Sequence, residues 1–445
     1  MLVAPARVPA TRRLAATLYG YAFLTDLVLL YPLYVLLFAD TGLSVGQISS
    51  LFVLWSAAGI LLEIPSGAWA DALSRRLLLC LAPLLTAAGF ALWVLLPSYP
   101  AFAVGFLLWG AGGALRSGAL EALVFTELDR LGAADRYARL IGRARTAEVF
   151  GAVGSGVLAG PVFALGGYLA VGAASVLTCL LAAAVAARLP ERRAPVTAPA
   201  TDRPAPAVAG PGETASGGGP GETASGGGPG ETAFGAGPGE DATEDEPGWR
   251  ESLRGGLAEV RADRAVRAAV LLVAAVAAIW GGLDEYTGLL ARDTGVAEAA
   301  VPLLLLLVWG GMSVGGLLAP LGERLSHRGY AGLLVVAAVA TAAGALLRHP
   351  AGFLLLAVAF AAFQLATVLA DARLQARITG DARATVTSLA GMATDLTTVA
   401  CYAGYGLLAG ALGNPAAFAV AVLPYLGVAF WLLTGRGVTR WKKEQ

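Results

Sequence analysis

Twelve apolar segments recur along the chain, and each is long enough, at about 20 residues, to cross a lipid bilayer as a helix. Hydrophobic residues make up 57% of the 445 residues and charged residues only 14%, whereas an average soluble domain is about a quarter charged. The sequence therefore predicts an all-α integral membrane protein with twelve transmembrane helices. The predicted spans are Leu14–Phe38, Val45–Ala70, Arg76–Leu96, Ala101–Leu128, Arg139–Val162, Gly167–Arg188, Val266–Leu290, Ala300–Leu321, Tyr330–Leu347, Phe353–Arg373, Ala384–Leu412 and Ala416–Thr434.

The basic residues are distributed unevenly between these spans. When the N-terminus is placed in the cytoplasm, only Arg292 and Arg348 of the 31 Lys and Arg residues fall in loops on the opposite side, and Arg116 falls inside a span. Cytoplasmic loops of membrane proteins carry an excess of Lys and Arg. The sequence therefore predicts a multi-pass protein of the plasma (inner) membrane with both termini in the cytoplasm.

A Gly-, Pro- and Ser-rich segment at residues 190–249 interrupts the apolar pattern. It repeats the nonamer GPGETASGG from Gly210 and again from Gly219. Such a segment cannot bury enough apolar surface to offset the entropy lost on ordering. We expect a disordered cytoplasmic linker between one six-helix bundle at residues 1–189 and a second at residues 250–445; a regulatory docking segment is the alternative.

Short motifs recur at one fixed distance in the two predicted bundles. Asp40-Thr-Gly follows the first span and Asp293-Thr-Gly follows the seventh, while Asp71 and Glu323 follow the second and the eighth. Both pairs are 252 to 253 residues apart. This shared spacing indicates duplicated halves, and parallel repeats of six helices hold a substrate site between them, near the middle of the membrane.

Several classes of site are excluded by the residue types of the chain. Lysine occurs only at Lys442 and Lys443, so a phosphate-binding G-x-x-x-x-G-K-[ST] loop is impossible. The two histidines, His327 and His349, lie beside separate loops, which argues against a His-based metal site. Basic and acidic residues number 31 each, so no net charge attracts nucleic acid. We expect no cofactor, no metal and no nucleic-acid partner.

The loop between the second and third spans reads Gly67-Ala-Trp-Ala-Asp71-Ala-Leu-Ser74-Arg75-Arg76. It resembles the G-x-x-x-D-x-x-G-R-[RK] signature of the major facilitator superfamily, with serine in place of the second glycine. The resemblance implies two six-helix bundles around a central cavity, with this loop latching one conformation of the transport cycle. A charged turn that keeps arginines in the cytoplasm explains Arg75 and Arg76 equally well, but it gives no reason for Gly67 and Asp71.

Two further segments resemble motifs of the same family. Glu63 opens Glu-Ile-Pro-Ser-Gly, which looks like the E-x-P-[ST]-G lead-in of bacterial efflux members of the drug/proton antiporter type, and we assign Glu63 to the latch. The fifth span, from Gly151 to Pro161, is similar to the Gly-rich motif associated with antiporters of this superfamily. Small residues four apart also let helices pack closely, so packing alone would explain the glycines.

Arg116 in the fourth span looks like the arginine of the family's R-x-x-x-G motif. A charge near the middle of the membrane costs about 2.5–3.5 kcal/mol and needs a partner. Asp26 lies at a similar depth in the first span, so we predict that the two side chains face each other. In the family, such an arginine near a titratable acid takes part in proton coupling; a static ion pair is the alternative. Glu121 and Glu148 either join this network or line its cytoplasmic mouth.

The second half holds acidic residues without a neighbouring cation in the membrane. These are Asp284 and Glu285 in the seventh span and Asp395 in the eleventh. Unpaired carboxyls in apolar surroundings favour the neutral form, which suits a proton carrier. Successive helix residues point about 100° apart, so at most one of Asp284 and Glu285 faces a cavity. We predict proton carrying by Asp284 or Asp395, with hydrogen bonds in helix packing as the alternative.

Three aromatic residues lie deep within the predicted spans, namely Tyr31, Trp280 and Tyr402. We predict that they line an apolar substrate cavity, and ordinary helix packing is the alternative. The expected protein is a monomeric, non-enzymatic secondary transporter in the lipid bilayer that exchanges a small amphipathic compound for protons by alternating access. A proton-coupled importer of a sugar or metabolite and a non-transporting scaffold or receptor are the alternatives.

Overall fold

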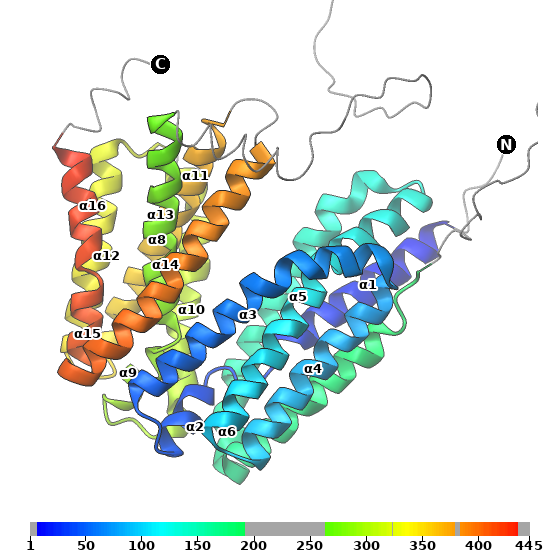
Figure 1. Cartoon of the computed structure of the whole chain (residues 1–445), viewed down its shortest axis with the longest axis horizontal. Coiled ribbons are helices and arrows are strands. Elements are labelled where there is room, and N and C mark those ends of the chain that lie inside the picture. Colours follow the sequence, from blue (N-terminus) through cyan, green and yellow to red (C-terminus); the bar gives the residue numbers. More distant parts are fainter. Residues whose placement is uncertain (1–6, 192–262, 323, 379–382, 435–445) are drawn as a thin grey trace, which may run out of the picture. The chain divides into compact units, whose positions relative to one another are not determined.

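The computed structural model describes residues 7–191, 263–322, 324–378 and 383–434. The side chains of residues 7–9, 63–72 and 383–384 lie outside the description, as do Glu323 and almost all of the predicted linker. Every regular element in the described ranges is a helix, and no β-strand occurs there (Figure 1). The predicted all-α fold is confirmed.

The first half contains six α-helices and one short 3₁₀ helix. They are α1 (Arg7–Asp26), α2 (Tyr34–Asp40), α3 (Val45–Ala72), α4 (Arg75–Leu95), α5 (Tyr99–Arg130), η1 (Ala134–Arg136) and α6 (Tyr137–Ala186). Helix α6 holds both the fifth and the sixth predicted span, which meet at a kink where Gly166 and Gly167 leave helical geometry. Gly167 has a φ of 59°, a conformation that glycine adopts without steric cost.

The second half follows the same order with more interruptions. It comprises α8 (Arg264–Asp284), α9 (Thr287–Arg292), η2 (Glu298–Ala300), α10 (Val301–Leu317), α11 (Ala319–Gly322), α12 (His327–Leu346), α13 (Gly352–Gln375), α14 (Arg383–Leu412), α15 (Asn414–Ala421) and α16 (Leu423–Leu433). The pairs α8–α9, α10–α11 and α15–α16 each occupy one predicted span.

Eight helical stretches of the described chain are long and apolar enough to cross a membrane by length and composition alone. One of them, Ala134–Ala186, is the folded-back pair of spans in α6. Helices α1, α5 and α14 are not among the eight, and α1 and α5 carry several charged residues. The helices are thus consistent with twelve spans, and the spans outside the eight include those that carry Asp26, Arg116 and Asp395.

The first span is broken in its middle, which the sequence pattern did not predict. The chain leaves helical geometry between Asp26 and Tyr34, where Pro32 removes a backbone donor. Two buried serines of α6 satisfy backbone groups of the break, because Ser155 donates to the Val28 carbonyl and Ser175 accepts from the Leu30 N–H. The break therefore depends on packing against α6.

The local geometry of the two halves repeats at the distance seen in the sequence. Gly42 and Gly295, which close the two Asp-Thr-Gly turns, both have positive φ, at 93° and 80°. Ser74 and Ser326 are both helix N-caps. The side-chain oxygen of each accepts a hydrogen bond from the backbone N–H three residues later. Ser74 thus starts α4 as a cap at the position where the family signature has glycine.

Helices pack closely where one of them carries a glycine. In the first half α4 packs against α5 and α6; in the second half α13 packs against α10 and α12. Gly112 lies directly against the Ala82 backbone, and a Cβ atom there would be 2.7 Å from the Ala82 carbonyl oxygen. Small residues at such positions allow backbones to approach in a membrane, where no hydrophobic effect pulls helices together.

The two halves touch through α3 with α14 and through α6 with α10. We call the loops around Asp40, Tyr168 and Asp293 the Asp40 end of the helices, and the opposite loops around Arg75 and Arg373 the Arg75 end. The glycines of the fifth span take part in the contact, since Gly156 meets Leu306 and Gly160 meets the Ala299 carbonyl. These small residues allow α6 and α10 to approach each other.

Candidate functional site

A cavity of about 370 Å³ lies among α1, α4, α5 and α6 of the first half. Its wall contains five charged side chains, which come from three of these helices. They are Asp26, Arg116, Glu121, Arg145 and Glu148. The predicted partners Asp26 and Arg116 thus face one space, and the two glutamates predicted near them line it too.

The two arginines of the cavity are held by the two glutamates. The nearest Arg116 and Glu148 atoms are 3.8 Å apart, while Arg145 lies 3.1 Å from Glu148 and 3.5 Å from Glu121. The Glu148 side chain is 14% exposed and that of Glu121 is 53% exposed. Glu148 therefore lies inside the cavity beside Arg116, and Glu121 lies at its mouth.

Arg145 is a member of this cluster that the sequence interpretation did not single out. It precedes Glu148 by three residues on α6 and bonds it from the same face. In the sequence it lies in an arginine-rich run that the charge distribution assigns to the cytoplasm. The three-residue spacing to Glu148 was the signal that could have identified it.

Asp26 terminates α1 and lies at the point where the first span breaks. The ion pair of Arg116 within the described chain is with Glu148 rather than with Asp26. The backbone around Asp26 is in close contact with Gly151, where a Cβ atom would collide with the Phe23 carbonyl oxygen. One glycine of the fifth span therefore sets how near α6 approaches the acid.

An aromatic stack separates this cavity from a second hollow. Tyr31 stacks on Trp109 with ring centroids 5.3 Å apart, and Trp109 stacks on Trp55 at 4.8 Å. Tyr31 and Trp109 line the first cavity. Trp55 and Trp109 line a second hollow of about 330 Å³, to which the second half contributes Asp395. The two spaces share Trp109, so Tyr31 and Asp395 lie on adjoining parts of one hollow region.

The predicted acids of the seventh span are placed at the contact between the halves. The Tyr34 hydroxyl donates a hydrogen bond to Glu285, and the next residue, Tyr286, shares a 2.7 Å hydrogen bond with Ser49. Asp284 lies beside Trp309, and its Oδ1 atom is buried without a hydrogen-bond partner in the described chain. Of the two acids, Glu285 is the one that reaches across to the first half.

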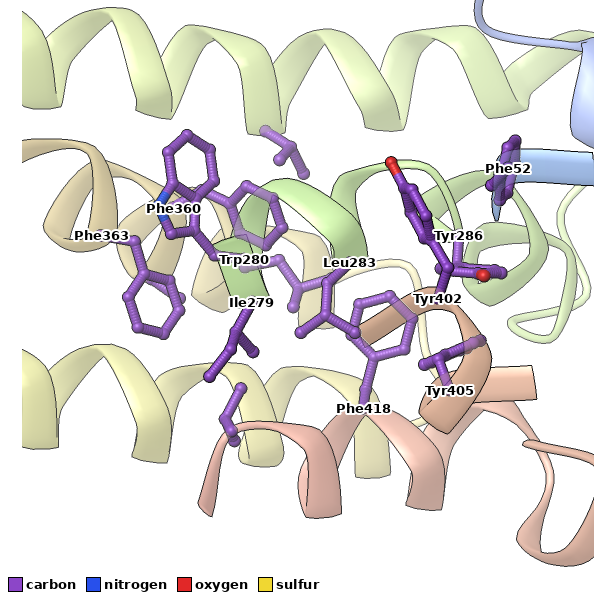
Figure 2. Close-up of a cluster of buried hydrophobic side chains, with 14 of the residues drawn as sticks. Phe52, Ile279, Trp280, Leu283, Tyr286, Phe360, Phe363, Tyr402, Tyr405 and Phe418 are labelled. Carbon is purple, nitrogen blue, oxygen red and sulfur yellow. The ribbon is translucent and has the colours of Figure 1, made fainter. Parts of the chain in front are cut away.

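Trp280 and Tyr402 lie in the aromatic core of the second half (Figure 2). The Trp280 ring N–H donates to the Thr367 hydroxyl at 3.0 Å, and its ring meets Phe360 edge-on. Tyr402 is 3% exposed and packs between Phe52 and Tyr286. Neither side chain is part of the walls of the two hollows described above.

The side chains of three predicted latch residues, Glu63, Gly67 and Asp71, lie outside the described residues. Arg75 donates to the Ala122 carbonyl at 3.2 Å and to the Thr126 hydroxyl at 2.9 Å, which ties the start of α4 to α5. Glu191 accepts hydrogen bonds from the Ser74 hydroxyl and from the backbone N–H of Arg75 and Arg76. An anion at this position stabilises the N-terminus of α4, and nothing in the sequence motif predicted it.

A polar cluster joins the halves at the Asp40 end. Arg292 forms an ion pair with Asp40, and the Tyr168 hydroxyl donates to the same carboxylate at 2.6 Å. Glu298 lies 3.9 Å from Arg292. Beside it, Asn414 donates to Asp293 at 3.0 Å. We refer to Asp40, Tyr168, Arg292 and Glu298 as the Asp40 cluster.

Within the part of the chain that the structure describes, no group of three or more His, Cys, Asp or Glu residues could hold a metal ion. The chemistry of the first cavity is that of carboxyl groups, guanidinium groups and aromatic rings. Such an arrangement can bind a small polar-apolar compound and can take up and release protons at its acids.

Comparison with solved structures identifies similar folds along almost the whole chain. A bacterial homologue of the human lysosomal transporter Spinster, in an inward-facing and unoccupied conformation, is 16% identical, with a TM-score of 0.66 and 98% of each chain covered. The nucleoside transporter NupG is 12% identical, with a TM-score of 0.64 over 95% of this chain and 98% of its own. A D-xylose–proton symporter is 16% identical, with a TM-score of 0.60 over 95% and 96%.

At these identities the similarity establishes a common fold, and it does not identify a common substrate. No curated protein sequence matches the chain. A family model is decisive, because the one described as Major Facilitator Superfamily matches residues 16–396. The chain is a multi-pass membrane transporter, not an enzyme, and it belongs to the Major Facilitator Superfamily.

Proposed function

We propose that the protein exports a small amphipathic compound in exchange for protons, by alternating access. The observation that carries the proposal is the cavity of the first half, where Asp26 and the Arg116–Glu148 pair share one wall with Tyr31 and Trp109. The aromatic rings provide apolar surface for a compound. The carboxyl groups provide a place for a proton within the same space.

The contacts between the halves support alternating access. The Asp40 cluster and the Tyr34–Glu285 and Ser49–Tyr286 hydrogen bonds join the halves toward the Asp40 end. The placement of arginines supports an orientation with the Arg75 end in the cytoplasm. In that orientation the described state is closed toward the outside, and export requires these contacts to break while the opposite ends come together.

The place of Asp26 in the cavity supports proton coupling. Each proton that moves down a membrane potential of 100 mV releases about 2.3 kcal/mol of free energy. A proton on Asp26 neutralises the carboxyl that has no ion pair in the described chain, whereas Glu121 and Glu148 have arginine partners. Proton uptake and release at Asp26 therefore changes the net charge of the wall next to Tyr31.

The test is a compound screen on purified protein in liposomes that contain a pH-sensitive dye. A transported compound is expected to drive proton movement in the opposite direction, and Asp26→Asn is expected to lower this coupled flux by at least ~100-fold, as for loss of a positioned proton-transfer group. The matched control is Asp129→Asn, an exposed acid at the end of α5. Undiminished coupling in Asp26→Asn would remove Asp26 from the mechanism.

A second candidate function is proton-coupled import. The fold likeness to a D-xylose–proton symporter supports it. The same liposomes separate the two, because in symport the compound and the proton enter together, whereas in antiport an inward proton gradient drives the compound out. Uptake of a sugar or metabolite with proton entry, and no exchange mode, would replace export by import.

A further inference from the structure

We propose that a hollow in the second half holds a segment of a phospholipid acyl chain, and that this occupancy favours the state in which the halves are joined at the Asp40 end. The hollow, which we call the Tyr286 pocket, has a volume of about 140 Å³ and lies among α8, α14, α15 and α16. It shares no lining residue with the charged cavity of the first half. The inference goes beyond the proposed function and does not depend on the direction of transport.

The Tyr286 pocket lies where small residues meet a break in the last span. Helix α15 ends at Ala421 and α16 begins at Leu423, with Pro424 in its first turn. Gly404 of α14 lines the same space, and a Cβ atom added there would meet no atom within 4 Å. The missing side chain on α14 and the interruption of the last span thus border a space that protein atoms do not fill.

The lining of the pocket is apolar. Among its ten lining residues, all within the described ranges, only Tyr286, Tyr405 and Cys401 have a polar side-chain atom. The Tyr286 hydroxyl is bonded to Ser49 at 2.7 Å, and the Tyr405 hydroxyl donates to Asn414 at 3.2 Å. The Cys401 thiol is only a weak donor. An apolar cavity of about 150 Å³ stays free of water and accepts a molecule as large as benzene, so the pocket is suited to hydrocarbon.

The pocket opens toward lipid. Its floor is buried, whereas Gly404 is partly exposed and Pro424 is exposed at the rim. The floor consists of Ile279, Gly282, Leu283, Tyr286 and Tyr405, four of which are labelled in Figure 2 together with other core residues. Next to rim residues in the sequence, Leu407 and Leu423 are 79% and 53% exposed. In a membrane protein such side chains contact acyl chains, which are as apolar as leucine. Acyl chains are therefore the apolar groups at the rim.

The depth of the pocket selects the acyl chain over the lipid head group. Helix α14 ends at Leu412, so Leu408 and Cys401 lie four and eleven residues before its end. At a rise of 1.5 Å per residue these positions are about 6 and about 17 Å from the end of the helix. Half of the hydrocarbon core of a bilayer is about 15 Å thick. The pocket is thus at the depth of the acyl chains of the leaflet at the Asp40 end.

Tyr286 connects the pocket to the contact between the halves. Its ring stacks on Tyr405 with centroids 3.8 Å apart and meets Phe52 of the first half edge-on at 5.3 Å. Together with the bond to Ser49, these contacts hold in place a ring that forms part of the pocket floor. A ligand favours the state that it binds better. An acyl chain packed on this ring therefore stabilises the joined state, and joining strengthens acyl-chain binding by the same factor.

The experiment is photolabelling of the full-length protein in phosphatidylcholine nanodiscs. One probe is a phosphatidylcholine with a diazirine in the middle of an acyl chain, and the other has the same diazirine in its head group. Mass spectrometry locates the adducts. The acyl-chain probe is expected to label Leu283, Tyr286 and Tyr405, which are buried, and the head-group probe is expected to leave them unlabelled. Absence of adducts on these side chains with the acyl-chain probe would overturn the inference.

Two glycine variants of α14 test whether the adducts come from the pocket. Gly404→Leu fills the space with a side chain, so it is expected to lower labelling of the floor by at least ~10-fold, as for the exclusion of two or more buried methylene groups. Gly410→Leu is the matched control, because a Cβ atom at Gly410 also meets no atom within 4 Å and Gly410 does not line the pocket. Equal labelling of the two variants would overturn the site.

Two serine variants of α3 test the link to the joined state. Ser49→Ala removes the bond to Tyr286 without touching the pocket lining, and it is expected to lower labelling of the floor about two- to fivefold, the usual range for one hydrogen bond. Ser50→Ala is the control, because its hydroxyl bonds Gln47 and Tyr99 within the first half. Equal labelling in these two variants would overturn the coupling.

A further outcome separates this pocket from the transport site. If a transported compound abolishes labelling of the floor in proportion to its own binding, the pocket belongs to that compound and the inference is overturned. The proposed function is measured independently as Asp26-dependent flux, since Asp26 does not line the pocket. Loss of coupled flux with intact labelling would contradict the proposed function alone. Melting temperatures verify that each variant is folded.

Discussion

The two halves share their turns and caps but differ in what lies at their centre. The first half combines aromatic packing around Trp93 and Phe106 with a hollow lined by charges, whereas the centre of the second half is described by the aromatic packing around Trp280 and Phe360 (Figure 2). At the repeat distance of 253 residues, Asp26 corresponds to Ile279 and Arg116 corresponds to Leu369. Helices α5 and α13 also begin 253 residues apart, at Tyr99 and Gly352, so the correspondence of Arg116 with Leu369 holds in the structure.

Backbone geometry and polar chemistry are therefore specified separately in the two halves. A positive-φ glycine after the first span of each half and a serine cap before the third are demanded by chain reversal, which both halves need. Chain reversal does not require a charged wall, and such a wall lines the hollow of the first half.

Placing an arginine in the second half should have the largest effect. Leu369 is 3% exposed in α13 and packs against Gly322, and Leu369→Arg puts a permanent charge among apolar neighbours. An uncompensated buried charge costs about 3–5 kcal/mol, so we expect little folded protein in the membrane fraction, measured by fluorescence-detected size-exclusion chromatography. Leu369→Met conserves the volume and should express normally. A well-folded Leu369→Arg protein would contradict the apolar character of this half.

Removing the arginine from the first half should impair transport more than folding. Arg116→Leu copies the residue of the second half and leaves Glu148 with Arg145 as its ion-pair partner. The wall then holds one more uncompensated acid, and we expect proton-coupled flux in liposomes to fall by ~100-fold or more. Arg136→Leu, in the η1 loop, is the control of equal chemistry. Wild-type flux in Arg116→Leu would exclude the arginine from coupling.

The contact between the halves should be weakened more by Tyr34→Phe than by Ser49→Ala. The first substitution leaves the Glu285 carboxyl buried without its donor, and the second removes a hydroxyl-to-hydroxyl bond to Tyr286. An unsatisfied buried group costs about 1–3 kcal/mol, whereas a neutral hydrogen bond contributes about 0.5–1.5 kcal/mol. Spin-label distances across the Asp40 end should shift toward separated halves in that order. The reverse order would show that Glu285 has another partner.

The smallest effect concerns pH at the Asp40 cluster. Burial raises the pKa of Glu298 above its ordinary value of 4.5, the Asp40 carboxyl raises it further, and Arg292 opposes the rise. A raised pKa means that Glu298 binds more protons when the two halves are joined at the Asp40 end than when they are separated. The joined state is therefore favoured as pH falls. The stabilisation of this state by protonated Glu298 is lost as pH rises through the raised pKa.

Because exposed ion pairs contribute little, we expect a population change of less than about threefold between pH 8 and pH 5. The same spin-label distances measure it. Glu298→Gln should remove this dependence, whereas Glu127→Gln at the Arg75 end should retain it. A joined state that becomes more populated at high pH would be opposite in sign and would rule out Glu298 as its cause.

Much of the site was predictable because charges in apolar segments are rare. Asp26, Arg116 and Glu148 stand out in a sequence where most residues of a span are apolar, and the structure places all three on one cavity wall. The place of Trp280 in the sequence does not decide between a cavity wall and helix packing. An aromatic residue deep in a span is equally suited to a cavity wall and to a packed core, and only the contact with Phe360 and Thr367 distinguishes the two.

Partners that come from another part of the chain were beyond the sequence. Tyr34 reaches Glu285 across 251 positions, and Glu191 reaches Ser74 across 117. Such pairs depend on how each helix is rotated about its axis. A shift by one residue rotates a side chain by about 100°, and apolar runs without a polar face do not define that rotation.

The sequence by itself determined the all-α membrane class and the repeated turns, because the length of an apolar run and the φ of a glycine are local properties. The tertiary structure alone decided which acid has a partner, which aromatic ring lines a hollow and where the first span breaks. These depend on contacts between helices, such as those of Ser155 and Ser175 with the broken span. Contacts of that kind arise only when the faces of several helices meet.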